Sequence, residues 1–170
     1  MIGSYDSCKS VIETISARPG LYGLTGGPEA GKTAVMMLFI HILAEEGKKC
    51  IVLSLGMSGV YWLEMMKDIG LNTDKVIINV NAHCRVEELK ALVKAEKPDM
   101  IFIDYTQSYD HGTSCSDKIP ELKELAAVVP VLLCSHPVRD TYCTEWMKSE
   151  NVIFGFCGQG EEMTVVSIDT

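Results

Sequence analysis

The sequence Gly26-Gly27-Pro28-Glu29-Ala30-Gly31-Lys32-Thr33 fits the pattern G-x-x-x-x-G-K-[ST] of a phosphate-binding loop. The apolar residues 21–25 before it predict a short buried strand, and residues 34–46 after it predict a helix. A loop in this setting surrounds a polyphosphate with backbone N–H groups, and the helix N-terminus faces the negative charge. We therefore expect the stretch from Gly26 to Ala34 to line a nucleotide site.

The last two side chains of the loop have separate expected roles. Lys32 is expected to reach the outer phosphates, and Thr33 to bind a magnesium ion. A plain glycine turn before a helix is the alternative interpretation, but it gives no reason for Lys-Thr at this spacing. The sequence has no N-K-x-D guanine motif, so ATP with Mg²⁺ is the expected ligand.

The composition is that of a globular protein. The chain has 170 residues, of which 47% are hydrophobic, and we expect one domain over residues 1–170. No apolar run approaches the ~20 residues that a membrane span needs, and the first residues lack the basic region of a secretory signal. The seven cysteines include no C-x-x-C pair, which favours a cytoplasmic location. His111 and Cys115 lack a second pair of ligands, so we interpret them as loop residues.

The formal net charge of −8 bears on nucleic-acid binding. Proteins that bind nucleic acid usually present a basic patch, and the only Lys/Arg cluster in this chain is Lys48-Lys49. We therefore expect weak DNA binding by the isolated chain.

Apolar strand patterns alternate with amphipathic helix patterns along the chain, which predicts an α/β fold with a mostly parallel sheet. Beyond the first strand and helix, the expected strands are residues 49–55, 75–80, 100–104 and 131–134, with a closing hairpin of residues 151–156 and 163–168. The expected helices are residues 60–69, 86–97 and 119–128, the last with Pro120 in its first turn. Residues 106–116 are expected to form a polar loop.

In open α/β sheets the ligand lies at the carboxyl ends of the strands. The strand over residues 100–104 ends in Asp104, which suits a carboxylate held near the magnesium of a bound nucleotide. The next strand is followed by Ser135 and His136. His136 is expected either to contact the γ-phosphate, as a catalytic residue beside Lys32 and Asp104, or only to cap the strand end.

Three segments resemble the RecA-like ATPase core of DnaB-type replicative helicases. Ser54-Leu55-Gly56-Met57-Ser58 is similar to their Ser-Leu-Glu-Met-Ser, and Ile103-Asp104-Tyr105-Thr106-Gln107 is similar to their Ile-Asp-Tyr-Leu-Gln. Cys134-Ser135-His136 stands where they carry Ser-Gln. The resemblance covers residues 20–168 and implies a RecA-like P-loop fold, ATP and Mg²⁺ as ligands, and partners such as single-stranded DNA or replication proteins, bound by an oligomer. KaiC and RadA proteins share this core.

The chain departs from the helicase pattern at catalytic positions. The glutamate that activates the attacking water in the family is replaced by Gly56, for which Glu29 and Glu64 are the nearest substitutes. The family's arginine finger should fall near Thr141, which is not basic, and Arg139 and Lys148 are the only cations close by. The end of the sequence has no Lys or Arg to match the family's other trans-acting cations. We expect no collar domain like that of DnaB before the core, and we expect residues 1–18 to form a helical segment packed on it.

Three hypotheses remain open. The first is an ATP-binding RecA-like domain with weak or lost hydrolysis. The second is an active DNA-dependent ATPase motor working as a ring, with Glu29 or Glu64 as the base. The third is a small-molecule P-loop kinase, which predicts an arginine-rich lid, whereas residues 106–116 contain no arginine.

Overall fold

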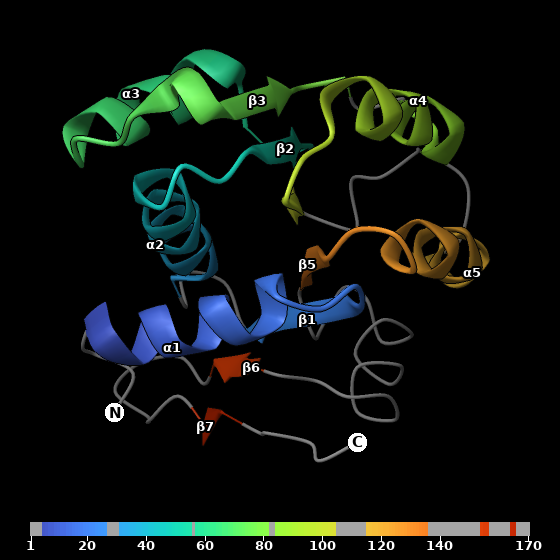
Figure 1. Ribbon diagram of the computed structural model, residues 1–170, viewed down its shortest axis with the longest axis horizontal. Coiled ribbons are helices and arrows are strands. Elements are labelled where there is room, and N and C mark those ends of the chain that lie inside the picture. The colour runs from blue at the N-terminus through green and yellow to red at the C-terminus, as the bar shows by residue number, and fades with distance from the viewer. Residues whose placement is uncertain are drawn as a thin grey trace.

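The computed structural model describes residues 5–26, 31–55, 57–81, 84–104, 115–135, 154–156 and 164–165. Helices and strands alternate along most of this sequence (Figure 1). The elements in order are α1 (Tyr5–Ser16), β1 (Leu21–Gly26), α2 (Lys32–Glu45), β2 (Cys50–Ser54), α3 (Gly59–Asp68), the 3-10 turn η1 (Thr73–Lys75), β3 (Val76–Asn79), α4 (Val86–Glu96), β4 (Met100–Asp104), α5 (Cys115–Ala126), β5 (Val131–Ser135), β6 (Phe154–Phe156) and β7 (Thr164–Val165).

The strands form one sheet in the order β3-β2-β4-β5-β1-β6-β7. All neighbouring strands are parallel except β6 and β7, which pair antiparallel. The expected α/β class with a mostly parallel sheet and a closing β-hairpin is therefore confirmed. Strand β4 has neighbours on both sides and is buried along its whole length, as its continuous apolar sequence predicts.

Helices cover both faces of the sheet, with α2 and α3 on the left and α4 and α5 on the right in Figure 1. Alternate residues of β4 enter the two cores, since Phe102 packs with the α2 side and Ile103 with the α5 side. This period of two is the geometry of a strand. It places Asp104, two residues after Phe102, on the face that α2 covers.

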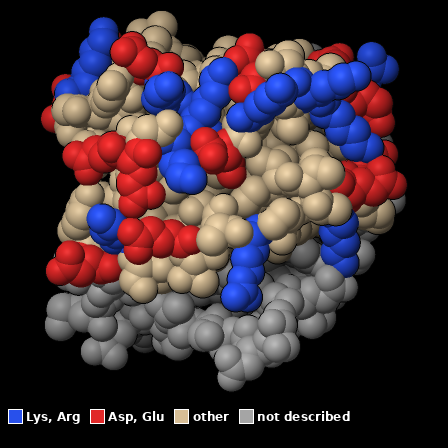
Figure 2. Space-filling model, in the orientation of Figure 1, with Lys and Arg blue, Asp and Glu red and all other residues tan. Residues whose placement is uncertain are grey.

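Acidic and basic side chains are interspersed over the face shown in Figure 2. Several form ion pairs, such as Lys49 Nζ with Glu96 Oε2 at 2.6 Å and Lys90 Nζ with Glu124 Oε2 at 2.8 Å. Basic and acidic groups are therefore mixed over much of this face.

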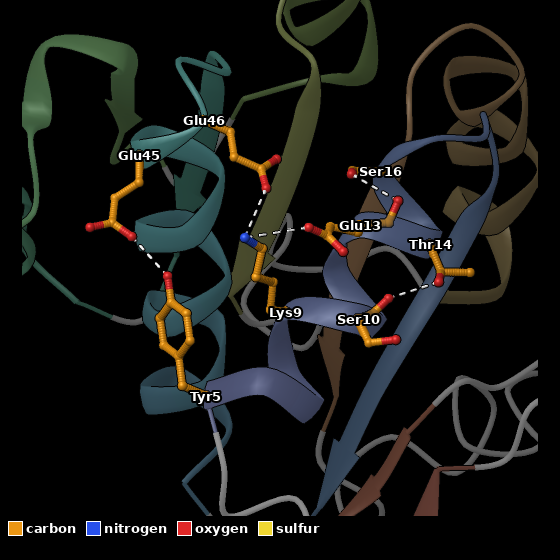
Figure 3. Close-up of polar contacts among 8 residues, drawn as sticks. All are labelled: Tyr5, Lys9, Ser10, Glu13, Thr14, Ser16, Glu45 and Glu46. Carbon is orange, nitrogen blue, oxygen red and sulfur yellow. Dashed lines mark hydrogen bonds and ion pairs between the residues drawn. The ribbon is translucent and has the colours of Figure 1, made fainter.

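The N-terminal helix α1 packs on α2 (Figure 3). Its apolar stripe of Cys8, Ile12 and Ile15 is buried at helical spacing. Polar contacts at the edge add to this packing, because the Tyr5 hydroxyl donates to Glu45 Oε2 at 2.8 Å and Lys9 Nζ lies 3.9 Å from Glu46 Oε1. The expected helical segment therefore packs against the helix that carries Lys32 and Thr33.

One helix differs from the sequence expectation. Helix α5 begins at Cys115, so Pro120 lies inside it and not in its first turn. Proline lacks an N–H and crowds the preceding turn, which is why the sequence pattern favours a later start. The expected loop of residues 106–116 accordingly ends earlier, and residues 105–114 lie outside the described part of the chain.

The remaining elements agree with their expected ranges to within a few residues. Strand β3 (Val76–Asn79) is shorter than expected at both ends. At its start Lys75 belongs to η1, which the Asn72 side chain caps by accepting from the Asp74 N–H at 3.0 Å. None of the described helices is long and apolar enough to cross a membrane.

Candidate nucleotide-binding site

The expected phosphate loop joins β1 to α2. Gly26 ends β1, and Gly31 is the N-cap of α2 with φ of 81°, in the left-handed region. A residue with a Cβ would cost roughly 1–2 kcal/mol in this conformation. The backbone conformation therefore explains why the motif has glycine at position 31. A glycine N-cap also brings no side-chain acceptor to the first-turn N–H groups, which suits an external anion. Gly27, Pro28, Glu29 and Ala30 lie outside the described residues.

Polar side chains align across the carboxyl ends of three neighbouring strands. Ser54 of β2 pairs in register with Asp104 of β4. Ile103 pairs with Leu133, so the next position along places Asp104 beside Cys134 of β5. All three face α2, because they alternate with residues of the opposite core. Ser54 and Asp104 are 1% exposed and Cys134 is 0% exposed.

Helix α2 brings the two loop side chains to this row. The Thr33 hydroxyl donates to Asp104 Oδ2 at 3.2 Å, across 71 positions of sequence. Lys32 begins α2 and is only 6% exposed. The structure thus gathers Lys32, Thr33 and Asp104, the three residues that the sequence proposed for phosphate and metal.

Burial dominates the electrostatics of this cluster. Desolvation raises the pKa of Asp104, while the Thr33 hydroxyl, the Lys32 charge and the Cys134 thiol act in the opposite direction. Desolvation also lowers the pKa of Lys32, which the nearby Cys134 and Asp104 oppose. Both charged forms are therefore less stable here than in water, and a ligand that adds charge of the right sign would restore them.

The cluster fits a magnesium ion beside phosphates. Asp104 Oδ1 is buried and has no hydrogen-bond partner within the described chain, although carboxylates at such depth are normally satisfied. Magnesium binds proteins through one or two oxygen ligands plus substrate phosphates. The Thr33 hydroxyl and the unpartnered Asp104 oxygen supply that donor set. The described residues contain no cluster of three or more His, Cys, Asp or Glu side chains able to hold a metal alone.

Other expected catalytic positions are less well described. Gly56 and His136 lie outside the described residues. The turn on either side of Gly56 is fixed by the Ser54 hydroxyl, which donates to the Met57 carbonyl at 2.8 Å, and by Ser58, which caps α3. Glu64 is exposed on α3, in contrast to the buried cluster.

Sequence reasoning missed the place of Cys134. Its position in an apolar strand suggested a small hydrophobic residue. The sequence does show that Cys134 is the second-last residue of its strand, near the edge where the ligand is expected. Only the register between β4 and β5 shows that its thiol lies beside Asp104. Desolvation raises the pKa of Cys134 well above its usual value, and the nearby Asp104 adds to this.

These features define an α/β fold of the RecA-like type. Two solved structures show the likeness. A KaiC-like protein from Pyrococcus horikoshii superimposes with a TM-score of 0.60 at 22% identity, over 70% of this chain and 62% of that one. The flagellar accessory protein FlaH from Methanocaldococcus jannaschii superimposes with a TM-score of 0.65 at 10% identity, over 85% of this chain and 74% of that one.

At these identities the similarity defines the fold and not the activity. This chain spans 62% of the length of the KaiC-like protein. No protein-family model matches the sequence, and no curated protein matches it.

The buried carboxyl group predicts a pH-dependent stability difference. Because folding raises the pKa of Asp104, its contribution to stability is complete below the unfolded pKa of about 3.9 and is lost as pH rises through the folded pKa. Asp104→Asn cannot ionise, so its free energy of unfolding relative to the wild type should increase from about pH 4 upward, by about 1.4 kcal/mol for each pH unit between the unfolded and the folded pKa. Urea unfolding in a chelator without nucleotide measures this.

Asp68→Asn, at an exposed position of α3, controls for the loss of one negative charge. A difference between Asp104→Asn and the wild type that stays constant or shrinks with rising pH would show that Asp104 is not held in a desolvated site.

Proposed function

We propose that this chain binds ATP–Mg²⁺ at the carboxyl edge of its sheet. The observation that carries the proposal is the hydrogen bond from Thr33 to the buried Asp104, beside Lys32, directly after a P-loop sequence. Hydroxyl, carboxylate and ammonium groups from two distant segments meet where α2 begins. If these residues only stabilised the fold, neither the burial of Lys32 nor the unpartnered oxygen of Asp104 would be explained.

Each residue has a distinct task in this proposal. Backbone N–H groups from Gly26 to Ala34 hold the phosphates, and the N-terminus of α2 adds its partial positive charge. The Lys32 ammonium neutralises the outer phosphates, whose charge in turn favours its protonated form. Thr33 and Asp104 hold the magnesium ion, which neutralises charge on the phosphate oxygens when it is bound. We assign to His136, two residues after Cys134 in the sequence, a contact with the γ-phosphate.

The finer proposal is a relative of the DnaB helicase core with weak or lost hydrolysis. Support comes from residues 54–58 and 103–107, which resemble that family, and from the shared RecA-like fold. Gly56 has no carboxyl group with which to activate water, and Glu64 is exposed on α3. Binding without efficient turnover suits a nucleotide-sensing component of DNA replication or recombination.

The surface charge supports weak DNA binding by a single copy. Basic groups on the face of Figure 2 stand among acidic ones, and the net charge is −8. Tracking of a phosphate backbone needs net positive charge. Any DNA binding in this proposal therefore belongs to an oligomer or to a partner that supplies the basic surface.

Replacing the buried lysine tests nucleotide binding. Lys32→Ala removes a charged contact to the outer phosphates, and such contacts contribute about 1.5–3 kcal/mol. The affinity for ATP–Mg²⁺ should fall on the order of tenfold to a hundredfold in calorimetric titration. Lys67→Ala, at an exposed position of α3, is the matched control and should bind like the wild type. Equal affinity of Lys32→Ala and the wild type would refute the proposed site.

Restoring the missing acid tests the proposal of slow hydrolysis. Loss of a general base typically lowers a rate by ~10²–10⁴-fold, so Gly56→Glu should increase phosphate release from ATP. Gly56→Gln has the same size without the carboxylate and should not. A wild-type rate that already matches Gly56→Glu would mean that another group, such as Glu29, activates the water.

A further inference from the structure

Three polar or charged side chains are buried among the described residues, and all of them lie at the carboxyl edge of the sheet. They are Lys32, Ser54 and Asp104. Burying a polar group costs stability unless a partner satisfies it. Lys32 and Asp104 have tasks in the proposed function, whereas no task there falls to Ser54, which is only 1% exposed.

The pairing of β2 with β4 holds Ser54 beside Asp104. The two residues are partners in register. The Leu55 N–H donates to the Asp104 carbonyl at 2.7 Å, so the pairing continues to the ends of both strands. Adjacent strands lie about 4.8 Å apart. Both side chains lie on the α2 face, because they follow Val52 and Phe102 of that core by two residues. The Ser54 hydroxyl and the Asp104 carboxylate are therefore neighbours at the site.

One hydrogen bond determines how the Ser54 hydroxyl can act. The hydroxyl donates its proton to the Met57 carbonyl at 2.8 Å, because a carbonyl oxygen can only accept. A serine oxygen that has used its proton can still accept hydrogen bonds with its lone pairs. Ser54 is thus an acceptor toward the site, like the ionised Asp104 carboxylate beside it, and a further partner of its oxygen must be a donor.

Water held by a metal ion is a partner of this kind, because the metal occupies its oxygen and its hydrogens remain available to acceptors. Magnesium keeps several waters when one or two protein groups and phosphates bind it, and groups that hold such ligands affect metal affinity. We propose that Ser54 is a positioning residue for the magnesium ion, whose oxygen accepts a hydrogen bond from a water of the hydration shell and so orients the hydrated ion beside Asp104. The inference rests on the proposed function.

A purely local role for Ser54 is the alternative, since its bond to Met57 also closes the turn that leads into α3. Ser58 offers the comparison. Its oxygen accepts from the Tyr61 N–H at 3.3 Å and caps α3, and its side chain is exposed. Replacing either serine removes a hydrogen bond of the same turn, but Ser54 is the one that is buried beside Asp104. The magnesium requirement of nucleotide binding therefore separates the two roles.

The quantity to measure is the free Mg²⁺ concentration that gives half-maximal binding of ATP to the full chain, from calorimetric titrations at a series of Mg²⁺ concentrations. Ser54→Ala should raise this concentration by on the order of threefold to tenfold, the effect of one lost hydrogen bond. Its affinity for ATP in a chelator should equal that of the wild type. Ser58→Ala should be less stable but should keep the wild-type Mg²⁺ requirement. An equal rise in Ser58→Ala would overturn the inference, because the turn and not the Ser54 oxygen would then matter.

Ser54→Cys keeps the test valid if Ser54→Ala does not fold. It is close to serine in size and has an S–H group for the Met57 carbonyl, but sulfur is a weak acceptor, so the Mg²⁺ requirement should rise in this variant as well. If the wild type binds ATP with Mg²⁺ and the Ser54 variants keep its Mg²⁺ requirement, this inference alone is overturned. A wild type that does not bind ATP, or that binds it equally well without Mg²⁺, would overturn the proposed function and this inference together.

Discussion

The hydrogen bond between Thr33 and Asp104 is the interaction on which the rest of the site depends. It joins the first turn of α2 to the end of β4, and the strand that leads into α2, β1, is separated from β4 by β5 in the sheet. The contact exists because β4 is an interior strand covered on both faces, and because α1 and α3 pack with α2 on the same side. A shift of α2 by one turn would remove Lys32 and Thr33 together from the strand ends.

The same packing makes the site unfavourable for the empty protein. Asp104 is almost fully buried with one oxygen unpartnered, and Lys32 is desolvated beside it. Groups of this kind cost stability and are retained where a ligand needs them. The unfavourable burial of charged groups therefore occurs at the place where a bound polyphosphate and metal ion would stabilise those charges. The described salt bridges lie mainly on the surface, where each contributes little.

The sequence predicts the framework well and the details of the site only in part. The bounds of strand β4, Met100–Asp104, were predicted correctly. In an α/β chain, an uninterrupted apolar run that ends in a carboxylate is typical of an interior strand. The expected start of α5 was wrong. Pro120 suggested that the helix begins just before it, whereas the helix begins at Cys115 and continues through Pro120. Cys134 looked like a core residue, because the register that places it beside Asp104 depends on pairing between strands separated by a helix.

The stabilisation of the protein by its proposed ligand tests the central claim most directly. A ligand at 100 times its Kd stabilises the folded state by about 2.7 kcal/mol, which corresponds to a rise in Tm of about 5–11 °C for a domain of this size. We expect this rise for the wild type with ATP and Mg²⁺, and little of it when a chelator removes the metal or when Asp104→Asn is used. An equal rise in all three cases would contradict the assignment of Thr33 and Asp104 to the metal.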